Sequence, residues 1–145
     1  MIHELQYSLI THIEQNMPEV DGVHWLYTGM EKPGVESLPF VTVEFLIDNI
    51  RRLTKDSTTE SVFRFQVGIA SLDAGSHAKM ISKLKRLLLF KDAVLFDTDG
   101  PLPVPIGTIT FGIEDITSLG TGEIEELTRY NQTYFDVYTT ITYNK

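Results

Sequence analysis

The sequence predicts an α+β fold: a mainly antiparallel β-sheet with two helices packed on one face and a protruding long β-hairpin. Two amphipathic stripes at helical spacing predict the helices. Two long runs of alternating apolar and polar residues predict the hairpin. A chain of 145 residues with 42% hydrophobic content suits a single domain, 1–145, with a sizeable core. The expected order of elements is α-β-β-β-α-β-β-β.

The first helix is expected over residues 2–16, and Pro18 blocks its continuation. Its apolar stripe consists of Ile2, Leu5, Leu9 and Ile13. The second helix follows Ser71-Leu72-Asp73, which offers candidates for an N-terminal cap. Its apolar stripe is Ala78, Ile81, Leu84 and Leu88. The side expected to face solvent carries Lys79, Lys83, Lys85 and Arg86.

The hairpin is predicted from alternation in residues 40–50 and again in 63–69, with the polar segment 51–60 as its tip. Short strands are expected at 23–27 and 93–96, one strand around 109–113, and a last strand through 134–141. Proline-rich 101–105 suits an edge or the entry to a strand. Glycine and proline predict surface loops at 29–39 and 117–126.

Composition excludes several classes of protein. The absence of cysteine rules out a disulfide scaffold and a thiolate metal site. A net charge of −8 argues against sequence-specific binding of nucleic acid, because most of the surface repels a polyanion. No apolar run approaches the ~20 residues that cross a bilayer, so no membrane association is expected and the chain is expected to be soluble when made.

No constellation of residues suggests catalysis. The four histidines, His3, His12, His24 and His77, lack metal-ligand spacing. Asp73 and His77 fit a capping or surface pair. Residues 97–100 fit a turn, because they lack the further oxygen ligands of a calcium loop. Residues 120–122 lack the Lys-Ser/Thr pair of a phosphate loop. The sequence therefore predicts no catalytic residue, cofactor or metal, and a protein that is not an enzyme.

Two charged segments are the candidates for interfaces. The tip of the hairpin combines apolar and basic residues, which suits either a solvated tip or a docking arm that packs on a neighbouring sheet; its candidates are Ile50, Arg51, Arg52, Leu53 and Lys55. The second loop is acidic and fits a solvated loop or a contact with a partner; its candidates are Glu123, Glu125 and Glu126.

Taken in order, nearly the whole chain resembles the tail terminator or tail-completion proteins of long-tailed bacteriophages. The resemblance rests on the first helix, the strand entry Leu38-Pro39-Phe40-Val41-Thr42-Val43, the strand Phe63-Arg64-Phe65-Gln66-Val67-Gly68-Ile69 before the second helix, and the closing strand Arg129-Tyr130-Asn131-Gln132-Thr133-Tyr134-Phe135-Asp136-Val137.

The resemblance implies a structural, head-tail joining protein that caps the head-proximal end of the tail tube as a hexameric ring. Its implied partners are copies of itself, the tail-tube protein and a head-completion or neck protein. Its implied place is the tail or neck of the virion, after assembly in the cytoplasm of the host bacterium. The alternatives are another neck or head-tail connector protein, or a non-viral ligand-binding or regulatory module with a pocket walled by Trp25, Tyr27 and residues 29–39.

Overall fold

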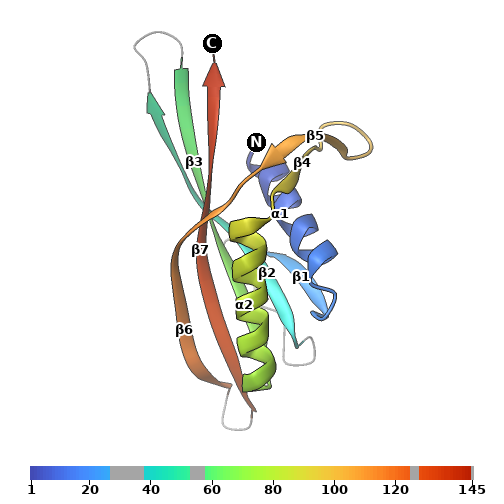
Figure 1. The fold of residues 1–145 in the computed structure, drawn as a ribbon, viewed down its shortest axis with the longest axis vertical. Helices are drawn as coiled ribbons and strands as arrows, with labels where there is room; N and C mark the ends of the chain where they lie inside the picture. Colours follow the sequence, from blue (N-terminus) through green and yellow to red (C-terminus); the bar gives the residue numbers. More distant parts are fainter. Residues whose placement is uncertain (27–37, 53–57, 125–127, 145) are drawn as a thin grey trace.

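The computed structural model describes residues 1–26, 38–52, 58–124 and 128–144. It confirms the predicted α+β class (Figure 1). The elements are α1 (Ile2–Asn16), β1 (Gly22–Leu26), β2 (Phe40–Arg52), β3 (Thr58–Ser71), α2 (Ala74–Phe90), β4 (Ala93–Asp97), β5 (Val104–Ile109), β6 (Gly112–Ile124) and β7 (Thr128–Asn144).

The main sheet has the strand order β1-β2-β3-β7-β6, and β4 pairs with β5 in a separate two-stranded sheet. β1 runs parallel to β2, and the other pairs are antiparallel. The ladder between β2 and β3 extends from Phe40↔Ala70 to Arg52↔Thr59. β7 has 17 residues and pairs with β3 on one side and β6 on the other. It therefore spans the sheet from end to end.

Three expectations from the sequence are wrong in detail. The strand expected around 109–113 is two strands, because β5 ends at Ile109 and β6 begins at Gly112. Ile109 and Phe111 are both buried, so the alternation continues across the break and hides it. The loop expected at 117–126 belongs to β6 as far as Ile124, with an irregular register after Ser118. Segment 51–60 is also strand at both ends, up to Arg52 and from 58 onwards.

One hydrophobic core joins both helices to the sheet. Figure 1 shows α1 and α2 on the same side of the long strands. Alternate residues of β2, β3 and β7 point into this core, because residues two apart on a strand share a face. Its fully or almost fully buried members include Leu5, Leu9, Ile13, Val41, Val43, Phe65, Val67, Leu84, Leu88, Phe135 and Val137. Most of the predicted stripe of α1 is buried, except Ile2. In α2 the predicted Leu84 and Leu88 are buried together with Met80 and Leu87, whereas the predicted Ala78 is exposed.

Gly68 in the central strand β3 is a point of close approach. A Cβ atom there would lie 2.7 Å from Thr42 Oγ1 and 3.0 Å from Tyr134 Cε1, on the strands at either side. Replacing Gly68 by alanine is therefore expected to lower the free energy of unfolding by about 1–3 kcal/mol, the usual effect of overpacking. Urea denaturation measures this change.

Gly75 provides the matched control for that substitution. Its added Cβ would meet nothing closer than Asp73 Oδ2 at 3.5 Å, and alanine favours a helix more than glycine does. Gly75→Ala should raise the free energy of unfolding by about 0.5–1 kcal/mol. Equal effects of the two substitutions would contradict the steric argument.

Candidate interaction surface

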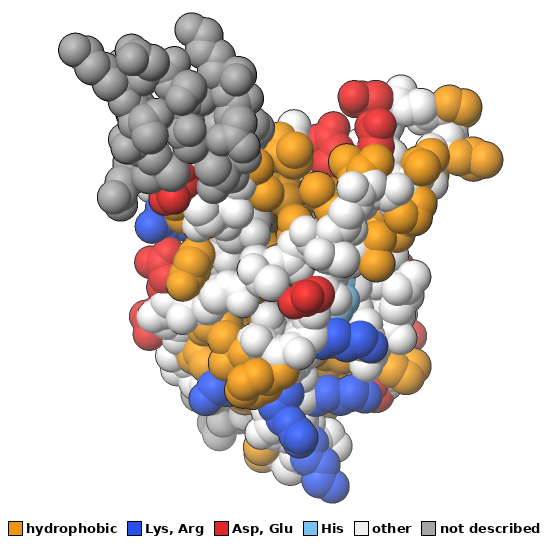
Figure 2. All heavy atoms as spheres, turned by 45° about the horizontal axis from the view of Figure 1, so that its top comes forward, with side chains coloured by type: hydrophobic (Ala, Val, Ile, Leu, Met, Phe, Trp, Pro, Cys, Tyr) orange, Lys and Arg blue, Asp and Glu red, His pale blue; other side chains and the backbone are white. Residues whose placement is uncertain are grey.

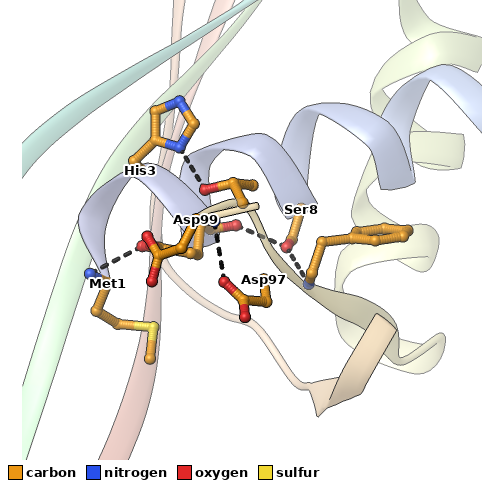
Figure 3. Close-up of polar contacts among 8 residues, drawn as sticks. Met1, His3, Ser8, Asp97 and Asp99 are labelled. Atoms are coloured by element: carbon orange, nitrogen blue, oxygen red, sulfur yellow. Dashed lines mark hydrogen bonds and ion pairs between the residues drawn. The ribbon is translucent and has the colours of Figure 1, made fainter. Parts of the chain in front are cut away.

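The β4–β5 sheet is held against the first two turns of α1 (Figure 3). The backbone N–H of Phe96 donates to Ser8 Oγ at 3.0 Å, and Ser8 Oγ donates to the carbonyl of Glu4 at 2.6 Å. The rings of Tyr7 and Phe96 meet edge to face with their centroids 5.6 Å apart. The hydrogen bond to Ser8 occupies an edge of β4, so β5 forms the outer strand of this small sheet.

The turn after β4 is fixed by two more hydrogen bonds (Figure 3). One of 2.8 Å joins His3 Nδ1 and Thr98 Oγ1, and another of 3.0 Å runs from the Asp99 N–H to Asp97 Oδ1. The second bond is the local side-chain contact of an Asx turn, as predicted for residues 97–100. Within the described ranges no three histidine or acidic side chains are grouped to hold a metal ion.

The outer face of the β4–β5 sheet is apolar. Alternation along β5 points Val104 and Ile106 outward, and they are 54% and 56% exposed. Val94 belongs to the same face through its pairing with Thr108, and Leu102 in the connecting turn is 74% exposed. Figure 2 shows hydrophobic side chains gathered on this part of the molecule, at the upper right. We call Val94, Leu102, Val104 and Ile106 the outer apolar face.

The predicted interface residues at the hairpin are only partly described. Ile50 lies near the end of β2 and is 73% exposed. Arg51 and Arg52 complete β2, and their side chains lie outside the described part of the structure. Leu53 and Lys55 lie outside the described residues altogether.

The acidic candidates lie at the other end of the sheet. Glu123 belongs to β6, with its side chain outside the described part, and Glu125 and Glu126 are outside the described residues. At one end of β7, Asn144 pairs with Thr58; at the other, Thr128 pairs with Ile124. The described ends of β2 and β6 therefore lie at opposite ends of β7, a length of roughly 50 Å for an extended strand, and are not brought together.

A cleft with a volume of about 480 Å³ lies where β2 begins and α2 starts. Its walls are Glu19, Leu38, Pro39, Ser71, Leu72, Asp73, Ser76, Lys79, Met80 and Lys83. A salt bridge of 3.0 Å between Lys83 and Glu19 crosses one side. The Asp73 carboxylate caps α2 by accepting from the Ser76 N–H at 2.8 Å, which lowers the pKa of Asp73. Of the pocket walls expected from the sequence, Leu38 and Pro39 line this cleft, and its other walls were not predicted because they come from separate segments.

Most walls of the pocket expected beside Trp25 lie outside the described residues. Trp25 is half-buried and packs on the core, and its ring lies 5.0 Å from that of His3 on α1. It is not among the residues that line the cleft. Tyr27 and residues 29–37 lie outside the described residues.

His77 is a buried histidine and not the surface partner of Asp73 that its spacing suggests. Its Nδ1 lies 2.7 Å from Ser71 Oγ, and its Nε2 lies 2.9 Å from Thr133 Oγ1 on β7. Thr133 in turn bonds Ser118 of β6 at 3.0 Å. Helical spacing places His77 near Asp73, but the sheet supplies hydroxyl groups that satisfy both ring nitrogens. This small network fastens the start of α2 to the sheet.

Burial of His77 predicts a loss of stability in mild acid. Burial lowers the pKa of His77 below 6.5, because the buried site disfavours the charged ring. The unfolded chain then binds more protons than the folded one as the pH falls below about 6.5. The contribution is present in full above that pH and is lost as the pH falls towards the folded-state pKa. Denaturation curves at pH 7.5 and 5.5 measure the slope.

His77→Gln should flatten this pH dependence, since glutamine keeps hydrogen-bonding groups but does not titrate. Burial also lowers the pKa of His12, so part of the slope should remain. Equal slopes for the wild type and His77→Gln would contradict the assignment.

The chain matches no protein-family model and no curated protein sequence. Neither described helix is long and apolar enough to cross a membrane. The outer apolar face gathers four exposed aliphatic side chains and is the candidate surface for a partner. The sequence carries a signal for it, because Leu102, Val104 and Ile106 alternate with prolines and glycine, yet that pattern gives no indication of which side faces solvent.

Proposed function

We propose that this chain is a structural subunit that caps the head-proximal end of a phage tail tube as a ring and presents the surface to which the head attaches. The observation that carries the proposal is the outer apolar face, held on α1 by the contacts of Ser8, Tyr7 and His3. The order of helices and strands that resembles tail terminators supplies the biological setting.

The outer apolar face suits docking for an energetic reason. Removing apolar surface from water contributes about 25 cal/mol per Å², so covering several half-exposed aliphatic side chains favours association by a few kcal/mol. Because β4 is already fixed to α1, little flexibility remains to be lost on binding. Pro105 removes one backbone donor from the outer strand, which favours contact through side chains over addition of a further strand.

The shape of the sheet supports the same proposal. A subunit between a tube and a head needs separate surfaces for different neighbours. Here the end of β2, the outer apolar face and the end of β6 lie on different parts of the fold (Figure 1). One long strand, β7, connects the two ends rigidly through ladders on both sides.

Deleting the gene from the phage or prophage that carries it tests the function. Electron microscopy of the resulting particles should show tails of abnormal length that are not joined to heads, because an uncapped tube continues to polymerise and lacks the joining surface. Tails of normal length still attached to heads would contradict the proposal.

The cleft of about 480 Å³ favours a second candidate function, a ligand-binding or regulatory module. Its volume is within the range of pockets for small ligands, about 300–1,000 Å³. A metabolite screen by thermal shift separates the two candidates, since a ligand that binds only the folded state raises the unfolding temperature. A shift abolished by Leu72→Asp, at the wall of the cleft, would favour the module.

A further inference from the structure

Helix α2 carries a strip of positive charge in an acidic protein. Lys79, Lys83 and Arg86 follow one another at spacings of four and three residues, which places them on one side of the helix. All three side chains are exposed. α2 contains no acidic residue, whereas the whole chain has a net charge of −8. Figure 2 shows Lys and Arg side chains gathered in the lower part of that view. We call these three residues the basic stripe.

Most of the charge on the basic stripe is available to a partner. Lys83 forms a salt bridge with Glu19 at 3.0 Å. Within the described ranges, neither Lys79 nor Arg86 forms an ion pair. A carboxylate partner would therefore gain contacts without displacing existing ones at these two positions. Such contacts are individually weak at a surface and strengthen when several act together.

The basic stripe borders the apolar cleft. Lys79 and Lys83 line the cleft together with the apolar residues Leu38, Pro39, Leu72 and Met80. Leu72 is 57% exposed, so an aliphatic side chain can reach it from outside. A segment that fits this surface carries several carboxylates with an aliphatic side chain among them. Such a segment meets both the cations and the cleft.

The chain itself contains a segment of this composition. Residues 123–126 read Glu-Ile-Glu-Glu, which gives three carboxylates and one aliphatic side chain in four residues. Its first two residues, Glu123 and Ile124, end β6 where β6 pairs with the start of β7.

We propose that residues 123–126 of a second copy of this chain dock on the basic stripe and the cleft beside it. The acidic segment of one copy and the basic stripe of another are different surfaces, so the contact can repeat head-to-tail, and it forms a ring where the rotation between neighbours closes. This proposal deepens the ring function proposed above and rests on it for its biological setting. A duplex nucleic acid is the poorer fit, because three cations in a chain of net charge −8 attract a polyanion weakly and the cleft is apolar.

Cross-linking of the full chain tests the contact. A mixture of ¹⁴N- and ¹⁵N-labelled protein is treated with a carbodiimide, which joins ammonium and carboxylate groups in direct contact, and the products are identified by mass spectrometry. We expect mixed-isotope peptides joining Lys79 to Glu123, Glu125 or Glu126, and fewer of them as salt is added. Absence of these peptides at low salt and high protein concentration would overturn the proposal.

Charge reversal supplies the matched control. Lys79→Glu with Arg86→Glu should reduce the cross-link yield at Lys83 at least tenfold. Lys85→Glu should leave it within twofold, because Lys85 is about 240° around the helix from Lys79. Adding Glu123→Lys and Glu126→Lys to the first variant should restore association, read as dimers and larger species by native mass spectrometry. Failure of this rescue in a chain that unfolds at the wild-type temperature would also overturn the proposal.

Two probes show whether the basic stripe binds the acidic segment or nucleic acid. They are a labelled peptide of residues 120–128 and a duplex oligonucleotide. The peptide should bind the wild type and lose at least tenfold in affinity to the Lys79→Glu, Arg86→Glu variant or when its glutamates are replaced by glutamine. Binding of the oligonucleotide alone, dependent on the same lysine and arginine, would overturn the proposal in favour of nucleic acid. Normal tails after gene deletion would remove the tail function but leave a positive cross-link unaffected, so the two failures are distinguishable.

Discussion

Replacing Val104 and Ile106 together by aspartate is expected to abolish joining of tails to heads while leaving the protein folded. Both side chains are more than half exposed, so their removal takes little from the core. Two carboxylates placed in a covered apolar contact would lose hydration without a partner, which costs several kcal/mol. A deletion phage supplied with the variant gene provides the assay, with joined particles counted by electron microscopy.

Phe90→Lys is the control for that variant. Phe90 is 81% exposed at the end of α2 and is not one of the four residues of the outer apolar face, so this change also introduces a charge at an exposed apolar position. We expect Phe90→Lys to support normal joining and both variants to unfold within about 0.5 kcal/mol of the wild type. Normal joining by the double aspartate variant would refute a docking role for the outer apolar face.

Phe65→Ala is expected to lower the free energy of unfolding by about 3–5 kcal/mol, which approaches the whole stability of many domains. Phe65 is 0% exposed in the central strand β3, between β2 and β7. Its ring meets that of Phe45 at 5.6 Å, and Val137 is its register partner on β7. Truncation removes these contacts and leaves a cavity that the paired strands cannot close. Urea or thermal denaturation measures the loss.

Phe90→Ala removes the same side-chain atoms from a surface position. Comparing it with Phe65→Ala therefore isolates the effect of burial on the free energy of unfolding. At 81% exposure, it should change the free energy of unfolding by no more than about 0.5 kcal/mol. Similar losses for Phe65→Ala and Phe90→Ala would contradict the assignment of Phe65 to the core.

Some features of the candidate surfaces could be predicted from local sequence. The spacing that puts Lys79, Lys83 and Arg86 on one side of α2 is visible in the sequence, as is Asp73 as the cap. The cleft and the outer apolar face were not predictable, because Leu38, Leu72 and Glu19 lie far apart in sequence and only the fold decides which aliphatic side chains stay uncovered. Asp73 is the predicted cap, but its predicted surface pair with His77 is wrong for the same reason: Thr133, 56 residues away, bonds the His77 ring.

The sequence by itself determined the α+β class, the two helices and the buried alternation of β2 and β3, because these follow from periodic burial of neighbouring residues. Only the tertiary structure decided that β6 extends through the glycine-rich residues 117–124, since pairing with β7 satisfies a backbone whose side chains favour a loop. It also decided the parallel placement of β1 on β2 and the outward direction of Val104 and Ile106. Strand pairing and exposure depend on partners distant in sequence, which local patterns do not specify.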